Sequence, residues 1–216
     1  MKTALIGCRT LESEISAAAG LTGWDGPVYW LKSGLHDKTD ILHETAQKLI
    51  DSCQKYDRIL LAMGICGNSV MGLRTDHAEL IFPRVDDCIT LLCGSRDKRA
   101  QYYRSYFFTE GWLRGERTIW HEYQYTVKKY GEDTAKLVFD TMLRHYRSCI
   151  FLDTHCGDTK ACAETVRHIA DHLQLGYEKI DGTLQYLCTL LSGPWHSDDF
   201  VIIPPHTTVA NKHFNV

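Results

Sequence analysis

The chain has 216 residues, of which 44% are hydrophobic and 24% charged, and its formal net charge is −3. This length and composition exclude a disordered or fibrous chain and indicate one globular domain over residues 1–216. The charge balance provides no basic surface for nucleic acid or an anionic membrane. No apolar run approaches the ~20 residues that span a bilayer, so we expect no membrane association.

Short apolar runs alternate with segments of helical periodicity. This pattern predicts an α/β fold with an open, mostly parallel, Rossmann-like sheet and helices on both faces. Strands are expected at residues 3–7, 28–31, 58–63, 79–83, 149–153 and 200–204. Helices are expected after the first strand with Thr10 as N-cap, at residues 40–53, from residue 89, and at residues 161–173. In the second of these helices, one face would carry Ile41, Leu42, Ala46, Leu49 and Ile50.

Residues 96–147 differ from the rest of the chain because Tyr, Trp and Arg are concentrated there. We expect a helical insertion with a loop near Gly111 and Trp112, which covers an edge of the sheet or closes over the site as a lid. The aromatic side chains between residues 102 and 125 would be partly exposed, and such a surface is compatible with a homodimer.

The nine cysteines cannot all form disulfides with one another, since their number is odd. The first residues lead into an expected strand and do not resemble a signal peptide. We therefore expect a reducing cytoplasm, where clustered thiols serve as ligands or nucleophiles more often than as cross-links.

Three cysteines and one histidine are expected near the carboxyl ends of four strands. Cys8 follows the first strand, His36 the second, Cys66 the third, and Cys88 comes shortly after the fourth. In open parallel sheets, ligands bind at the carboxyl ends of the strands, so these side chains should converge. The sequence therefore predicts a metal centre held by the three cysteines, with His36 as a candidate fourth ligand.

Physical arguments support this site. Buried thiolates need a compensating cation, and Gly64 and Gly67 beside Cys66 leave room for a bulky cofactor. Helix N-termini after Cys8 and Cys88 are expected to lower the pKa of the thiols. Three cysteines with one open position fit either a [4Fe–4S] iron–sulfur cluster or a catalytic zinc ion.

Other residues offer alternatives. Four cysteines in apolar segments are expected to pack as small hydrophobic side chains, namely Cys53, Cys93, Cys149 and Cys188. A second cluster after the strand at residues 149–153 contains His155, Cys156 and Cys162, and His206 follows the last strand. His155, Cys156 and His206 are therefore further candidates for the fourth ligand, although the spacing of Cys156 and Cys162 is not typical of zinc sites.

Common nucleotide-binding, zincin and serine-hydrolase motifs are absent from the sequence. The turn Gly64-Ile65-Cys66-Gly67-Asn68 does resemble a nucleophile elbow with Cys in place of Ser. A metal-free enzyme with Cys66 as nucleophile, and His36, His155 or His206 as its base, is thus an alternative of a different class.

The segments around the three cysteines resemble the bacterial and archaeal family of domain of unknown function 1638. The resemblance rests on Cys8 with Glu12 and Glu14, Gly34-Leu35-His36, Gly64 to Asn68, Pro83 to Leu92, Gly94-Ser95, Gly111-Trp112 and Asp199-Phe200-Val201. Asp86 departs from the His that we associate with this position in many members. The resemblance implies three shared cysteines and proximity to corrinoid-dependent methyltransferase genes in anaerobes, and the three-cysteine arrangement is similar to that of quinolinate synthase.

We therefore expect a metal-binding protein, with a [4Fe–4S] cluster favoured over zinc, acting on a small molecule or on the methyl carrier of a corrinoid protein. The open position would act as a Lewis acid. Asn68 and Arg84 would orient the substrate, Asp87 or His36 would transfer protons, and Trp112 would close over it. The alternatives are a zinc-thiolate methyltransferase, and an accessory protein or metallochaperone without catalytic activity.

Overall fold

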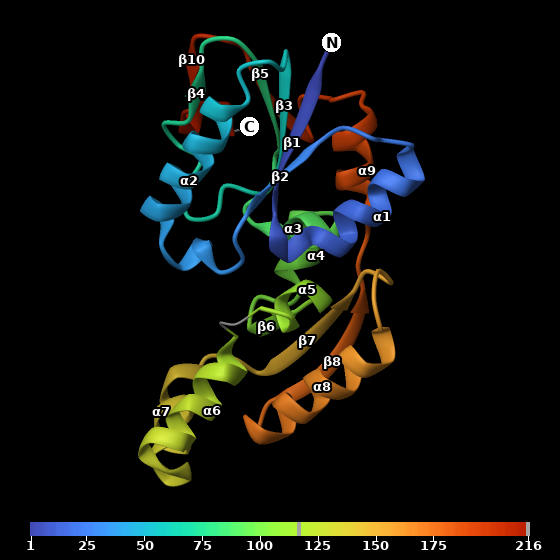
Figure 1. The fold of residues 1–216 in the computed structure, drawn as a ribbon. Helices are drawn as coiled ribbons and strands as arrows, with labels where there is room; N and C mark the ends of the chain where they lie inside the picture. Colours follow the sequence, from blue (N-terminus) through green and yellow to red (C-terminus); the bar gives the residue numbers. More distant parts are fainter. Residues whose placement is uncertain (116–117, 215–216) are drawn as a thin grey trace.

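The structure is a computed structural model that describes residues 1–115 and 118–214. It confirms the α/β fold class. The protein has a five-stranded, mostly parallel, Rossmann-like sheet and a second, three-stranded parallel sheet, and helices pack against both (Figure 1). In the described residues, no helix has both the length and the apolar character that crossing a membrane requires.

The first sheet has the strand order β2-β1-β3-β5-β9. Its strands are β1 (Thr3–Cys8), β2 (Val28–Leu31), β3 (Arg58–Ala62), β5 (Glu79–Pro83) and β9 (Phe200–Ile203). The first four run parallel, whereas β9 pairs antiparallel with β5 at the edge. β3 lies at the centre, and Ile59, Leu60, Leu61 and Ala62 are fully buried, as the unbroken apolar sequence of this strand predicts.

Helices cover both faces of the first sheet. On one face, α1 (Glu12–Thr22) packs beside α9 (Gln185–Ser192), and on the other lies α2 (Thr39–Ser52) (Figure 1). Three of the five apolar residues predicted to share one face of α2 are buried, namely Leu42, Ala46 and Ile50. Ile41, near the start of this helix, is 45% exposed.

The chain leaves the first sheet through two short helices, α3 (Cys88–Cys93) and α4 (Arg96–Ala100), and builds the second sheet. That sheet consists of β6 (Ser105–Phe108), β7 (Ser148–Asp153) and β8 (Gly176–Asp181). Its helices are α5 (Glu110–Leu113), α6 (Ile119–Tyr130), α7 (Glu132–Leu143) and α8 (Thr159–His172). The chain then returns through α9 to β9 in the first sheet (Figure 1).

The second sheet differs from the sequence prediction. Residues 96–147 were expected to be helical, but they include β6, and residues 116–117 lie outside the described residues. The strand at β7 was predicted, although it pairs with β6 and β8 and does not join the first sheet. β8 was not predicted because Tyr177, Glu178 and Lys179 give it no apolar run, as is common for an edge strand with exposed side chains.

The two parts of the molecule are joined near the end of β1. The 3-10 helix η1 (Arg9–Leu11) precedes α1, so the N-cap of α1 is Leu11, and the prediction of Thr10 as N-cap was wrong. A β-carbon at Gly111 in α5 would collide with the carbonyl oxygen of Thr10. Because α5 approaches the backbone of η1 so closely, the second part of the chain lies directly against the residues that follow β1.

Two further short elements lie away from this junction. The strands β4 (Arg74–Thr75) and β10 (Thr207–Thr208) form a small antiparallel ladder, and the 3-10 helix η3 (Asn211–His213) follows it. His206 immediately precedes β10 and lies 3.4 Å from a carboxylate oxygen of Asp76. Since β9 is antiparallel, His206 lies at the opposite end of the sheet from the cysteines, and the prediction that it reaches the same end was wrong.

Candidate metal centre

A cavity of about 590 Å³ lies at the carboxyl ends of the parallel strands of the first sheet. Its lining includes Cys8, the last residue of β1, Cys66 in the turn after β3, and Cys88, the first residue of α3. All nine cysteines of the chain are free. The structure thus brings together in one cavity the three thiols that the strand pattern predicts should converge.

The backbone itself holds Cys66 and Cys88 near each other. The amide of Ile65 donates a hydrogen bond of 3.0 Å to the carbonyl of Val85, and the amide of Cys66 donates one of 2.8 Å to Asp86. A β-carbon on Gly64 would lie 2.6 Å from the amide nitrogen of Asp87. Gly64 is therefore needed for the close approach of two backbone segments, whereas we had predicted that it leaves room for a cofactor.

Burial controls the protonation of two of the thiols. Removal from water raises the pKa of the Cys66 thiol to about 12, and the neighbouring Cys8 and Asp87 add to this effect. Burial also raises the pKa of Cys88 well above its usual value, with Cys66 and Cys8 contributing. The prediction that the thiolate of Cys88 is favoured was wrong, because burial outweighs the lowering that the backbone at the start of α3 supplies. Without a cation nearby these thiols stay protonated at neutral pH, and a bound metal would stabilise the thiolates.

The spacing of the sulfur atoms distinguishes kinds of metal centre. Across the part of the chain that the structure describes, the group with three ligand atoms within 4.8 Å of one another consists of Asp153, His155 and Asp181. The thiols of the three cysteines do not lie that close together. A tetrahedral zinc ion with Zn–S bonds of ~2.3 Å holds its sulfur ligands about 3.8 Å apart. In this structure the three thiols are therefore not spaced as the ligands of one bound zinc ion.

His36 and Asp87 also line the cavity, as predicted. The Nε2 atom of His36, in the 3-10 helix η2 (Leu35–Asp37), lies 3.2 Å from a carboxylate oxygen of Asp37, and its ring centre is 4.8 Å from that of Trp112. Asp87 is the N-cap of α3, and its Oδ1 accepts hydrogen bonds from the amide and the hydroxyl of Thr90 at 2.7 and 2.8 Å. Asp87 thus fixes the start of the helix that carries Cys88.

The other predicted residues have different positions. Gly67 lines the cavity in the left-handed conformation (φ 66°), which favours glycine. Asn68 is exposed and is not among the lining residues. Neither is Arg84, whose guanidinium donates hydrogen bonds to the carbonyls of Ser197 and His213 at 2.9 and 2.8 Å. These bonds hold the Arg84 side chain away from the cavity, and Asn68 does not line it, so we exclude both residues from the site.

The candidates for a fourth ligand reduce to one. His155 and Cys156 follow β7 in the second sheet and do not line the cavity, and His206 lies at the far end of the first sheet. His36 alone among the four candidates lines it. If the centre has a fourth protein ligand from this set, it is His36.

Several lining residues were not predicted. Lys32 follows β2 directly. The rule that ligands bind at the carboxyl ends of strands, which identified His36, could therefore have identified Lys32 too. Arg99 lies on α4, which leads from the first sheet to the second, and Tyr106 on β6 and Tyr146 before β7 belong to the second part of the chain. Their approach depends on how the two sheets pack, and no local pattern in the sequence reports that.

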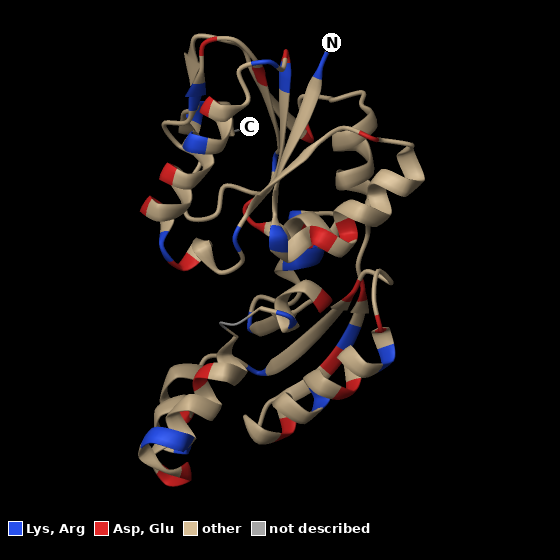
Figure 2. Ribbon diagram, viewed as in Figure 1, with Lys and Arg blue, Asp and Glu red and all other residues tan. Residues whose placement is uncertain are grey.

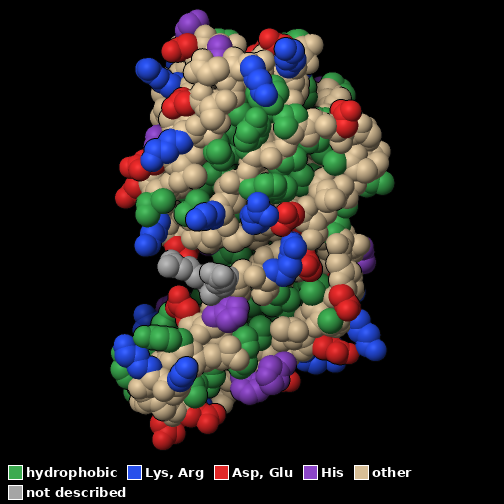
Figure 3. All heavy atoms as spheres, in the orientation of Figure 1, with side chains coloured by type: hydrophobic (Ala, Val, Ile, Leu, Met, Phe, Trp, Pro, Cys, Tyr) green, Lys and Arg blue, Asp and Glu red, His purple; other side chains and the backbone are tan. Residues whose placement is uncertain are grey.

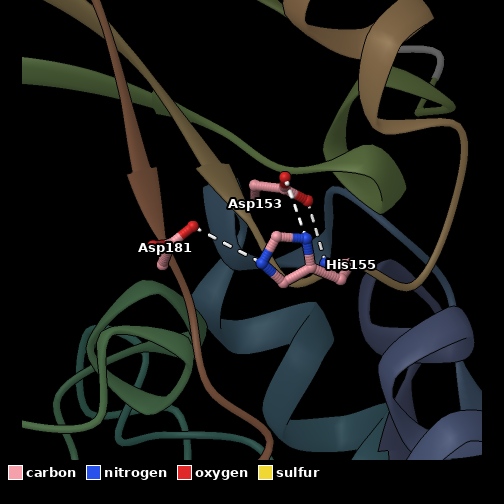
Figure 4. A group of neighbouring side chains, drawn as sticks. All are labelled: Asp153, His155 and Asp181. Carbon is pink, nitrogen blue, oxygen red and sulfur yellow. Dashed lines mark hydrogen bonds and ion pairs between the residues drawn. The ribbon is translucent and has the colours of Figure 1, made fainter.

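A second group of polar side chains lies at the carboxyl ends of β7 and β8. Figure 4 shows His155 between Asp153 and Asp181, with Nδ1 3.2 Å from Asp153 and Nε2 3.4 Å from Asp181. The ammonium of Lys179 lies 2.8 Å from Asp153, whose pKa is lowered by its hydrogen bonds despite its burial. Since Lys179 already neutralises the buried carboxylate, this group is an ion-pair network that needs no metal ion.

Comparisons with known proteins give one match. A family model described as "Protein of unknown function (DUF1638)" matches residues 30–191. No curated protein and no solved structure matches the chain. The matched segment runs from β2 into α9 and contains Cys66 and Cys88, whereas Cys8 precedes it.

Proposed function

This chain belongs to the DUF1638 family of proteins of unknown function, and we propose that it binds a [4Fe–4S] cluster through Cys8, Cys66 and Cys88. One observation carries the proposal. Three thiols, located at or after the carboxyl ends of β1, β3 and β5 in the first sheet, line a single cavity of about 590 Å³. Three protein ligands would leave one iron of such a cluster open to a small molecule.

The residues present fit this centre. Burial keeps the Cys66 and Cys88 thiols protonated when no cation is near, so their site favours a positively charged group that replaces the protons. The sulfur atoms are spread more widely than a single zinc ion requires. The first observation suits any cationic centre, and the second argues against a single zinc ion in this arrangement, so we propose zinc only as the alternative metal.

The open iron of the cluster would supply Lewis-acid polarisation of a substrate oxygen. The protein's own side chains would act on the substrate around this position. We propose His36 as the group that moves a proton, because it lines the cavity and Asp37 at 3.2 Å orients its ring. Asp87 contributes negative charge beside Cys66 and Cys88 while it caps α3. Trp112 packs against His36 and covers this part of the cavity.

The metabolic setting that we propose is corrinoid-linked one-carbon metabolism in anaerobes, with a small molecule or a methyl carrier as substrate. This setting rests on the family resemblance alone. Free cysteines throughout the chain support a reducing compartment such as the cytoplasm.

Anaerobic purification followed by iron, zinc and acid-labile sulfide analysis tests the proposal. We expect about four iron and four sulfide per chain in the wild type, and a loss of both in Cys66→Ala. The matched control is Cys188→Ala on α9, a cysteine that does not line the cavity and should leave the metal content unchanged. Retention of metal after separate replacement of Cys8, Cys66 and Cys88 would show that the ligand set is wrong.

One observation favours a metal-free cysteine nucleophile as a second function. Cys66 has a φ of 45°, a strained conformation for a residue other than glycine and one that is typical of a nucleophile elbow. The raised pKa of its thiol argues against it, because a nucleophile needs the thiolate. Absence of stoichiometric metal together with rapid alkylation of Cys66 by iodoacetamide would favour this function. One zinc per chain without sulfide would favour a zinc-thiolate methyltransferase. Transfer of the cluster from this protein to an acceptor protein that lacks one would favour an accessory role.

A further inference from the structure

The cavity has a second wall that faces the thiols. It is formed by residues of the second part of the chain, above all the rings of Tyr106, Phe107, Trp112 and Tyr146. In the space-filling view the molecule narrows where the two parts meet, and Lys and Arg side chains lie along the edge of the upper part at this waist (Figure 3). A ligand between the two walls would therefore contact aromatic rings on one side and the metal centre on the other.

Two basic side chains line the same cavity, Lys32 after β2 and Arg99 on α4. Figure 2 shows basic residues along α4, which lies between the two sheets. Within residues 1–115 and 118–214, the Lys and Arg side chains that form ion pairs are Arg9, Arg58, Arg96, Arg114 and Lys179. Lys32 and Arg99 thus bring positive charge to the cavity, although the chain as a whole has a net charge of −3.

The acidic residues of the lining are engaged with other groups. Asp86 accepts two hydrogen bonds from Arg96, each of 3.1 Å, and Asp87 caps α3. Arg99 packs its guanidinium over the ring of Phe107 at 4.3 Å, and Nη1 donates a long hydrogen bond of 3.4 Å to the carbonyl of Tyr102. This contact holds the guanidinium against the aromatic ring, and the N–H groups that it leaves free can pair with a carboxylate.

We infer that this half of the cavity binds a small planar carboxylate with an aromatic or similarly apolar body, whose carboxylate group contacts Arg99 and Lys32. The inference rests on the proposed function, since the other end of this ligand would face the metal centre. A cavity of about 590 Å³ falls in the range of ~300–1,000 Å³ that is usual for small-molecule sites. Arg and Lys can pair with a carboxylate or a phosphate, and the apolar rings of the lining favour the anion that has the smaller charge to desolvate.

Isothermal titration of the purified protein with 2-naphthoate tests the inference, with 2-naphthamide as the uncharged isostere and phenyl phosphate as the competing anion. We expect the carboxylate to bind at least tenfold more tightly than either. Arg99→Gln should weaken its binding at least tenfold, and Lys32→Gln should weaken it less. The matched control is Lys98→Gln on the same helix, which removes a basic side chain that does not line the cavity and donates to the carbonyl of Asp181, and it should leave the affinity unchanged.

Equal affinity for the amide, tighter binding of phenyl phosphate, or an effect of Lys98→Gln as large as that of Arg99→Gln would overturn the inference. Metal analysis of the same preparations separates it from the proposed function. Carboxylate binding by a protein that holds no metal would support this inference and refute the cluster. A full cluster without any selective carboxylate binding would support the cluster and refute the carboxylate site.

Discussion

Replacement of Gly64 by Ala tests how the structure brings Cys66 and Cys88 together. The added β-carbon would lie 2.6 Å from the amide nitrogen of Asp87, 2.7 Å from its Cα atom and 2.8 Å from the carbonyl carbon of Asp86. All three are backbone atoms, so no side-chain rotation can relieve the contact, and one of the two segments must move.

The expected cost is large for a single methyl group. Overpacking in a well-packed interior destabilises by about 1–3 kcal/mol, and contact with backbone alone places Gly64→Ala near 3 kcal/mol. For a chain of this size, 1 kcal/mol shifts the melting temperature by about 2–4 °C, so we expect a decrease of about 6–12 °C. Displacement of the segment that begins α3 also moves Cys88 away from Cys66, and the metal content should fall.

Calorimetry and metal analysis measure both effects, and Gly20→Ala in α1 is the control. A β-carbon at Gly20 has no neighbour within 4 Å, so this change should stabilise the helix by up to about 1 kcal/mol and leave the metal content unchanged. If Gly64→Ala melts within about 2 °C of the wild type, the two backbone segments are not packed as the structure shows, and the explanation for the position of Cys66 fails.

Three further predictions concern stability. Glu14 is fully buried, and burial raises its pKa although the hydroxyl of Thr154 donates a hydrogen bond of 2.8 Å to it. The free energy of unfolding of the wild type should therefore decrease as the pH rises above ~4.5. Glu14→Gln should lose this pH dependence and be the more stable protein at pH 7. Parallel urea titrations from pH 4.5 to 8 check this, and equal slopes for the two proteins would contradict it. Asp87→Ala removes the cap that accepts from Thr90 and should cost about 1 kcal/mol in the same assay, so an unchanged midpoint would count against that cap. Leu60→Ala at the centre of β3 should cost about 2–5 kcal/mol with an unchanged m value, and a loss below 1 kcal/mol would mean that this strand is not central.

The strands of the first sheet could be predicted because their burial is visible in local patterns. The apolar run of β3 needs cover on both faces, and β1, β2 and β5 each read as a short apolar segment between turns. Once these strands are parallel, their carboxyl ends lie at one edge, so Cys8, Cys66 and Cys88 could be selected from nine cysteines by position alone. The sequence by itself determined the fold class and six residues that line the cavity, namely Cys8, Cys66, Cys88, His36, Asp87 and Gly67.

The tertiary structure decided which sheet a strand joins and in which direction it runs. β7 is as apolar as the strands of the first sheet, yet it pairs with β6 and the polar edge strand β8, and this removes His155 and Cys156 from the cavity. The antiparallel pairing of β9 removes His206. The second part of the chain lies against the first and brings the aromatic wall to the thiols, and α4 between the two sheets carries Arg99. Hydrophobic periodicity reports whether a residue is buried but not against which partner, since that choice depends on contacts between residues far apart in the chain.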